Sequence, residues 1–112
     1  MAFDLVFTDQ AAADLEALEA DSSLGKRLKA VHKALGFLET NPRHPGLKTH
    51  KYASIRGGNG EEVFEAYAEN RTPAAWRIFW HYGPGNQHLT ILAITPHPVS
   101  YTHLTLPTIY SV

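Results

Sequence analysis

The fold is decided by the stretch from Ala75 to Pro98, AWRIFWHYGPGNQHLTILAITPHP. Its first half, Ala75 to Tyr82, alternates between two sides that are both largely apolar, which is typical of a central strand. One side has Trp76, Ile78, Trp80 and Tyr82, and the other has Arg77, Phe79 and His81. Gly83 to Asn86 contains glycines and a proline, the residues that tight turns require. Leu89 to Thr95 is rich in β-branched residues and ends at Pro96, so the whole stretch predicts a β-hairpin inside a sheet.

The elements before this hairpin follow from hydrophobic spacing and helix caps. Phe3 to Phe7 alternates as a short strand, and Thr8 or Asp9 is suited to cap a first helix that runs to about Ala20. A second helix is indicated by an apolar stripe, namely Leu24, Leu28, Val31, Leu35 and Leu38. Asn41 and Pro42 end this helix, so the two helices form an antiparallel hairpin.

The segment Pro42 to Gly60 reads as a loop-rich middle with a dense group of basic residues. A further strand is indicated over Glu61 to Asn70, and the residues that follow turn the chain into the central hairpin. We therefore expect an α+β fold, in which a four-stranded antiparallel sheet packs against an N-terminal two-helix hairpin. Phe3 to Phe7 is expected to join this sheet at an edge.

Composition bounds the possible functions. The 112 residues suit one domain, and 44% hydrophobic with 19% charged residues is ordinary for a globular protein. The absence of cysteine excludes disulfides, thiolate zinc sites and a cysteine nucleophile. A net charge of −1 is unlike that of a typical nucleic-acid binder, so such a role would depend on a local patch. The first residues, MAFDLVFTDQ, lack the features of a signal peptide, which predicts a cytoplasmic location.

Several kinds of chemistry have no motif in this sequence. The histidines do not show the i, i+4 spacing of helical zinc sites, so no metal and no cofactor are expected. The glycines from Gly57 to Gly60 precede a strand rather than a helix, which indicates a turn and not a phosphate-binding loop. There is no nucleophilic-serine elbow.

What remains is a set of cationic and titratable side chains around the central hairpin. The set consists of Lys48, His50, Lys51, Arg56, Arg71, Arg77, His81 and His97. Cleavage of RNA without a metal needs a base, an acid and cations that stabilise the phosphorane, and histidine suits proton transfer near neutral pH. On composition alone the plainer interpretation is favoured, in which these side chains complete hydrogen bonds and salt bridges on a sheet.

The order of elements and three segments resemble the RelE/ParE toxin superfamily of bacterial type II toxin–antitoxin modules. The segments are LKTHKY (Leu47 to Tyr52), VFEAYAENRTPAAWRIFW (Val63 to Trp80) and LAITPHP (Leu92 to Pro98). Together they look like the branch described as cytotoxic translational repressors, and the resemblance extends over residues 1–98. It implies a RelE/ParE-like domain over 1–98 and a cognate antitoxin as partner.

The resemblance implies two different targets. RelE-like members cleave mRNA on the ribosome without metal, whereas ParE-like members inhibit DNA gyrase. We expect a ribosome-dependent, metal-independent mRNA endoribonuclease that arrests translation; the alternatives are a gyrase inhibitor and a degenerate toxin that only binds antitoxin. For the nuclease, the expected catalytic residues are Arg77, His97, His81 and His50. The expected substrate-binding residues are Lys48, Lys51, Arg56 and Arg71.

Within this resemblance, Arg77 stands where ribonuclease members have a phosphate-contacting arginine, and His97 lies near the end of the last strand. The preceding strand departs from RelE, which has lysines there, since here it contains Glu62, Glu65 and Glu69.

The last residues differ in character from the rest of the chain. Val99 to Thr108, VSYTHLTLPT, resembles the translation of a transposon-type sequencing-library adapter. We therefore expect residues 99–112 to form a tail without function and exclude them from the candidate site.

Overall fold

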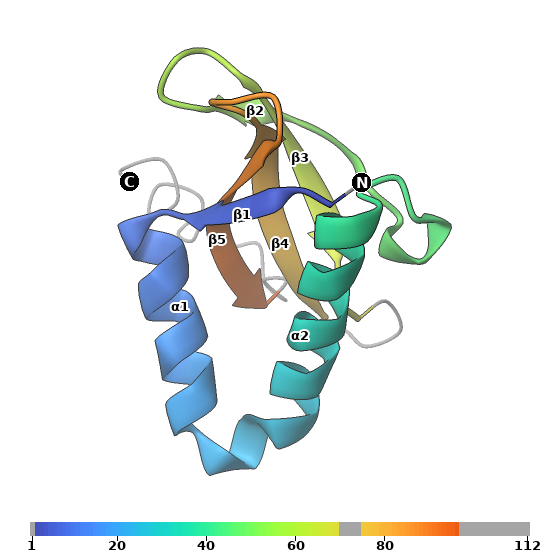
Figure 1. The fold of residues 1–112 in the computed structure, drawn as a ribbon. Coiled ribbons are helices and arrows are strands. Elements are labelled where there is room, and N and C mark those ends of the chain that lie inside the picture. Colours follow the sequence, from blue (N-terminus) through green and yellow to red (C-terminus); the bar gives the residue numbers. More distant parts are fainter. Residues whose placement is uncertain (1, 70–74, 97–112) are drawn as a thin grey trace.

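The computed structural model describes residues 2–69 and 75–96. Figure 1 shows two helices on one side of a twisted sheet. The elements are β1 (Asp4–Phe7), α1 (Asp9–Ala20), α2 (Gly25–Thr40), β2 (His50–Arg56), β3 (Glu62–Tyr67), β4 (Trp76–Tyr82) and β5 (His88–Pro96), with short 3-10 turns η1 (Ser22–Leu24) and η2 (Pro45–Leu47). The expected strand at the N-terminus, both helices and the central hairpin are therefore confirmed.

The sheet has five strands in the order β1-β5-β4-β3-β2, which places β4 at its centre. β1 runs parallel to β5, and the other neighbours are antiparallel. The expectation of four antiparallel strands is thus wrong in strand number and direction. The N-terminal strand does lie at an edge, as expected. Its neighbour there is β5, which is far away in the sequence, and local sequence patterns do not indicate whether two such distant strands run parallel or antiparallel.

β2 was missed because nothing in its own sequence marks it as a strand. Its residues, HKYASIR, are exposed or half-buried throughout, so no apolar alternation separates an inner from an outer face. Its pairing with β3 is also irregular, with a shift between Lys51 and Arg56. The strand exists because β3 offers a partner, and the basic segment is therefore ordered along a sheet edge rather than looped.

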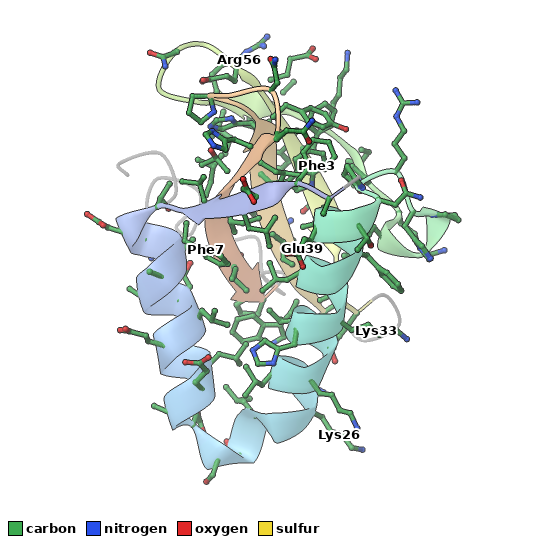
Figure 2. All side chains as sticks on the ribbon, in the orientation of Figure 1. Phe3, Phe7, Lys26, Lys33, Glu39 and Arg56 are labelled. Carbon is green, nitrogen blue, oxygen red and sulfur yellow. The ribbon has the colours of Figure 1, made fainter. Side chains whose placement is uncertain are left out.

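The main core lies between the helices and the sheet. Ile78 and Trp80 of β4 are fully buried there against helix residues such as Leu18, Val31 and Leu38. The side chains between the two layers can be followed in Figure 2. This confirms that Trp76, Ile78 and Trp80 face the same side. A smaller apolar cluster around Phe79 lies on the opposite face of the sheet.

α1 is attached to β5 beyond the point where β1 ends. The Thr8 hydroxyl caps α1 by accepting from Ala11 N at 3.1 Å, and it donates to the Leu92 carbonyl at 3.0 Å. Asp14 Oδ2 accepts from Ile94 N at 2.9 Å. β1 pairs with β5 only as far as Ile91, so these side chains satisfy backbone groups that lack a strand neighbour.

The hairpin turn between β4 and β5 uses glycine as predicted. Gly83 has φ 96°, a conformation in the left-handed region that glycine adopts without a steric penalty. Among the residues that the structure describes, no helix is long and apolar enough to cross a membrane.

Candidate functional site

The candidate site lies on the face of the sheet that the helices leave open. Because strand side chains alternate, Arg77 and Phe79 of β4 point away from the helix layer that buries Ile78 and Trp80. Glu65 of β3 is paired with Phe79, and His50 of β2 is paired with Glu65. Three strands thus bring His50, Glu65 and Arg77 side by side on one face.

Glu65 is the centre of this group. Its side chain is only 3% exposed, and both of its oxygens have partners. Oε2 accepts a hydrogen bond from Arg77 Nη1, and Oε1 accepts from His50 Nε2 at 2.7 Å. The Tyr67 hydroxyl lies 3.5 Å from the same Oε1. A buried carboxylate with this many partners has a fixed position, and it holds the groups around it in turn.

Arg77 is enclosed by the same arrangement. Its side chain is 6% exposed, and its guanidinium carbon lies 5.0 Å from the centre of the Phe79 ring. The charges of Arg77 and Glu65 compensate each other inside the protein, which offsets part of the desolvation cost and avoids the larger cost of one buried charge without a partner. The expected phosphate contact of Arg77 remains a prediction, since in this structure its charge is directed to Glu65.

His50 is the member of the group that solvent can reach, with a side chain 53% exposed. With Nε2 donating to Glu65, the lone pair of a neutral imidazole is on Nδ1. Nδ1 lies 3.4 Å from the Lys48 carbonyl, so a proton taken up there also finds an acceptor. This arrangement suits a group that accepts and returns a proton, because the carboxylate fixes the orientation of the ring and directs Nδ1 away from Glu65.

Tyr67 contributes a neutral hydroxyl next to the dyad of His50 and Glu65. Burial and the negative charge of Glu65 raise the pKa of the Tyr67 phenol, while the positive charge of Arg77 acts in the opposite direction. The hydroxyl therefore stays protonated at neutral pH and remains a hydrogen-bond donor. Its ring centre is 5.9 Å from that of His50.

The other expected cations are distributed around β2. Lys48 ends η2 in a left-handed conformation, φ 48°, two residues before His50. Lys51 forms an exposed ion pair with Glu62 at 3.1 Å, and Arg56 is exposed at the far end of the strand. Arg71 and His97 lie outside the described residues, so their expected roles remain predictions.

His81 is on the same face as Arg77 but not in the same place. It lies four residues further along β4, about 13 Å away at the usual rise of a strand. It is buried, and its Nδ1 lies 2.9 Å from the Tyr82 carbonyl. The turn at Gly57 covers it so closely that a Cβ at that glycine would lie 2.9 Å from the imidazole. The structure therefore gathers His50, but not His81, with Arg77.

Sequence reasoning did not select Glu65 or Tyr67 for the site. In the sequence Glu65 stands out only as one of the glutamates on an acidic strand. The available signal was its spacing: it is two residues from Val63 and from Tyr67 on a strand next to the one that contains Arg77. A carboxylate on an otherwise apolar strand face beside an arginine predicts a buried ion pair. Among the described residues, no group of three or more His, Asp or Glu side chains is arranged to hold a metal ion.

The architecture is similar to that of solved toxins of the YoeB, ParE and RelE types, which identifies the class of fold. A YoeB/ParE toxin from Agrobacterium tumefaciens aligns with a TM-score of 0.63 at 12% identity, over 86% of this chain and 100% of that one. The YoeB dimer from Staphylococcus aureus gives 0.58 at 16% identity, over 88% and 100%. The archaeal RelE–RelB complex from Pyrococcus horikoshii OT3 gives 0.61 at 14% identity, over 89% and 100%. No family model and no curated protein matches the sequence significantly.

Proposed function

We propose that this protein is the toxin of a type II toxin–antitoxin module and that a cognate antitoxin holds it inactive. The proposal is supported by the likeness in fold to three toxin structures, each covered over its whole length. One of those structures is a RelE–RelB complex. The segments LKTHKY and LAITPHP add the resemblance in sequence described above.

We further propose that the toxin cleaves mRNA on the ribosome without a metal ion. The observation that supports this most is the 2.7 Å contact between the exposed His50 and the buried Glu65. In this mechanism His50 Nδ1 takes the proton of a 2′-hydroxyl. The 2′-oxygen attacks the adjacent phosphorus, and the bond from phosphorus to the 5′-oxygen breaks. A second group protonates the departing 5′-oxygen, and His97 remains the predicted acid.

Each further residue has a distinct part in this proposal. Three cations follow one edge of the sheet: Lys48 two residues before β2, and Lys51 and Arg56 on it. In the proposal they contact the phosphates of an extended RNA strand. Arg77 acts as a positioning residue, because it holds the carboxylate that orients His50. The Tyr67 hydroxyl donates to substrate or to Glu65.

The test is a comparison of two histidines of equal exposure. His50 and His32 are both 53% exposed and both near a glutamate, but His32 lies on α2, away from the open face. His50→Gln should lower mRNA cleavage on ribosomes by at least about a hundredfold and abolish growth arrest. His32→Gln should remain fully toxic, and EDTA should not inhibit the wild type. A fully toxic His50→Gln variant would refute the assigned role of His50.

A gyrase inhibitor is the second candidate, and the neutralised charge of Arg77 favours it. A phosphate-cleaving site needs a cation directed at the phosphate, whereas here the Arg77 guanidinium faces Glu65. A binding protein has no such need. Cells that die with broken DNA and intact mRNA would establish this candidate. Unimpaired growth at high expression of the folded protein would favour a degenerate toxin that only binds antitoxin.

A further inference from the structure

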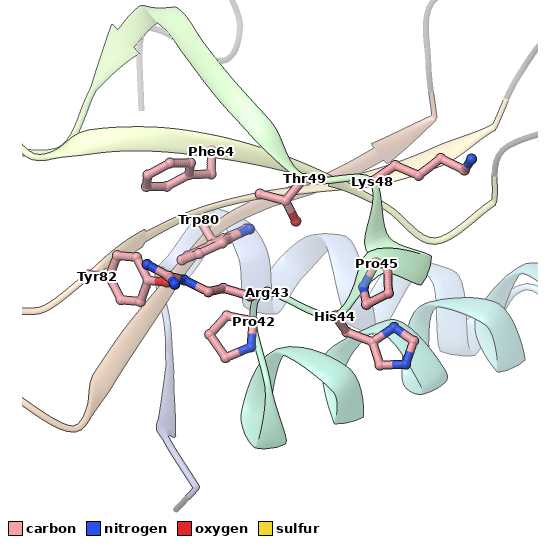
Figure 3. A pocket seen from close by; sticks show the side chains of 9 residues that line it. All are labelled: Pro42, Arg43, His44, Pro45, Lys48, Thr49, Phe64, Trp80 and Tyr82. Carbon is pink, nitrogen blue, oxygen red and sulfur yellow. The ribbon is translucent and has the colours of Figure 1, made fainter.

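A second concave site lies on the other side of the sheet from His50 and Glu65. It is a pocket of about 370 Å³ between the loop that follows α2 and the helix-facing side of β3 and β4. Figure 3 shows the loop residues Arg43 and Thr49 on one side and Phe64, Trp80 and Tyr82 on the other. His50, Tyr67 and Arg77, the partners of Glu65 on the open face, do not line this pocket. Lys48 and Thr49, which precede His50 in the chain, do line it.

Two polar atoms in this pocket have no hydrogen-bond partner in the described part of the chain. They are the indole Nε1 of Trp80 and the hydroxyl of Thr49, and both are inaccessible to solvent. Trp80 as a whole is 1% exposed. In Figure 3 the Thr49 hydroxyl points into the pocket, and the nitrogen of Trp80 is at the end of the ring nearer to Thr49. Because a buried donor without an acceptor is costly, the two atoms point to a ligand that supplies an acceptor.

The walls of the pocket are aromatic. The rings of Phe64 and Trp80 are stacked, with centres 4.9 Å apart and an interplanar angle of 27°. Tyr82 meets both rings edge-on, with its centre 4.9 Å from Trp80 and 5.9 Å from Phe64. Tyr82 is also partly exposed, so its ring is available at the mouth of the pocket. Such walls accept a flat ring that stacks or packs edge-to-face against them.

Arg43 adds a positive charge at the same mouth. Its side chain is exposed and extends in the direction of Tyr82 in Figure 3, whereas Lys48 points away. Within the described residues no carboxylate lies in ion-pair distance of Arg43. A guanidinium without a carboxylate partner, next to an aromatic pocket, favours a ligand with a carboxylate or a phosphate.

We propose that this pocket binds a small, planar aromatic anion. The ring packs against Phe64 and Tyr82, and the anionic group binds Arg43. Because Trp80 Nε1 and Thr49 Oγ1 are closed to solvent in this structure, binding includes a small outward movement of the loop at Thr49. An acceptor atom of the ring then receives hydrogen bonds from both. The volume is near the lower end of the range for small-molecule sites, which suits one ring system with its substituent rather than a peptide or an RNA strand. The proposal does not depend on the nuclease activity, because Phe64 and Trp80 in the wall of the pocket face the helix side of the sheet, away from His50 and Glu65.

The indole N–H of Trp80 allows a direct test on the full chain. The protein has two tryptophans, so an ¹⁵N–¹H spectrum contains two indole signals, which a Trp76→Phe variant assigns. Adenosine monophosphate and nicotinate, which both have a ring nitrogen acceptor and an anionic group, are the probes, with inorganic phosphate and adenosine as the partial ligands. Titration with either probe should shift the Trp80 signal saturably and leave that of Trp76 unchanged.

Three variants separate the parts of the site. Arg43→Ala should weaken adenosine monophosphate binding about tenfold, the loss of one charge-assisted contact. Thr49→Val, which keeps the side-chain shape, should also weaken it. Lys26→Ala, an exposed cation at the start of α2, should leave it unchanged. A Trp80 signal that neither probe moves at millimolar concentration would overturn the proposal. Adenosine that binds as tightly as its monophosphate would overturn the role of Arg43.

Discussion

Arg77 of β4 donates a hydrogen bond to Glu65 of β3, and both side chains are almost fully buried on the open face of the sheet. The pair joins two neighbouring strands on the side where no helix covers them. It also sets the position of the Glu65 carboxylate, which contacts His50. The same contact therefore bears on stability and on the proposed chemistry, and the two effects can be measured separately.

Breaking this pair from one side should destabilise the protein strongly. Glu65→Gln leaves the Arg77 charge buried without compensation, so we expect a loss of about 3–5 kcal/mol in the free energy of unfolding. Arg77→Met should have a similar effect, because it leaves the negative charge of Glu65 buried without its partner. The double variant should lose less than the sum of the two, because it leaves no unpaired charge. Urea unfolding measures all three, and a loss below about 1 kcal/mol in Glu65→Gln would contradict the interpretation.

Thr8→Val should separate α1 from β5. The change removes the helix cap and the hydrogen bond to Leu92 while keeping the shape of the side chain. A lost cap alone costs about 1 kcal/mol, which thermal unfolding can detect. Thr40→Val is the matched control, since the exposed Thr40 hydroxyl bonds only to carbonyls of its own helix. Equal losses in the two variants would mean that neither the cap nor the contact with β5 adds to stability.

The raised pKa of Tyr67 predicts a loss of stability in alkali. In the unfolded chain the phenol ionises near its ordinary pKa of 10.0, whereas in the folded protein it keeps its proton to higher pH. Above the unfolded pKa the unfolded state therefore binds fewer protons, and the free energy of unfolding falls as pH rises. Tyr67→Phe should show a weaker fall between about pH 9 and about pH 11 in urea unfolding. Identical slopes for the variant and the wild type would contradict this.

Residues 99–112 are proposed to lie outside the functional domain, so their removal should be harmless. Truncation after Pro98 should leave the melting temperature and the toxicity nearly unchanged. The measurement is thermal unfolding of the two proteins side by side. A stability loss above about 1 kcal/mol, the effect of one typical destabilising substitution, would show that the tail belongs to the domain.

The helices and the central hairpin were determined by the sequence itself. Apolar spacing placed α1 and α2, Thr8 and Asn41 marked a beginning and an end, and glycines marked the hairpin turn. These features act between residues close in the chain, so they leave a local pattern. The faces of β4 followed from the same alternation.

The tertiary structure alone decided how distant segments meet. β2 is a strand only because β3 pairs with it. The helix hairpin takes the chain from β1 to the opposite edge of the sheet, and β2, β3 and β4 lead it back to β5, which runs parallel to β1. The partner of Arg77 also depended on tertiary structure, because its guanidinium faces Glu65, which lies twelve residues earlier in the chain on the neighbouring strand. The unpartnered atoms of Thr49 and Trp80 likewise share one pocket only after folding, because the energy of such contacts depends on position in space and not on spacing along the chain.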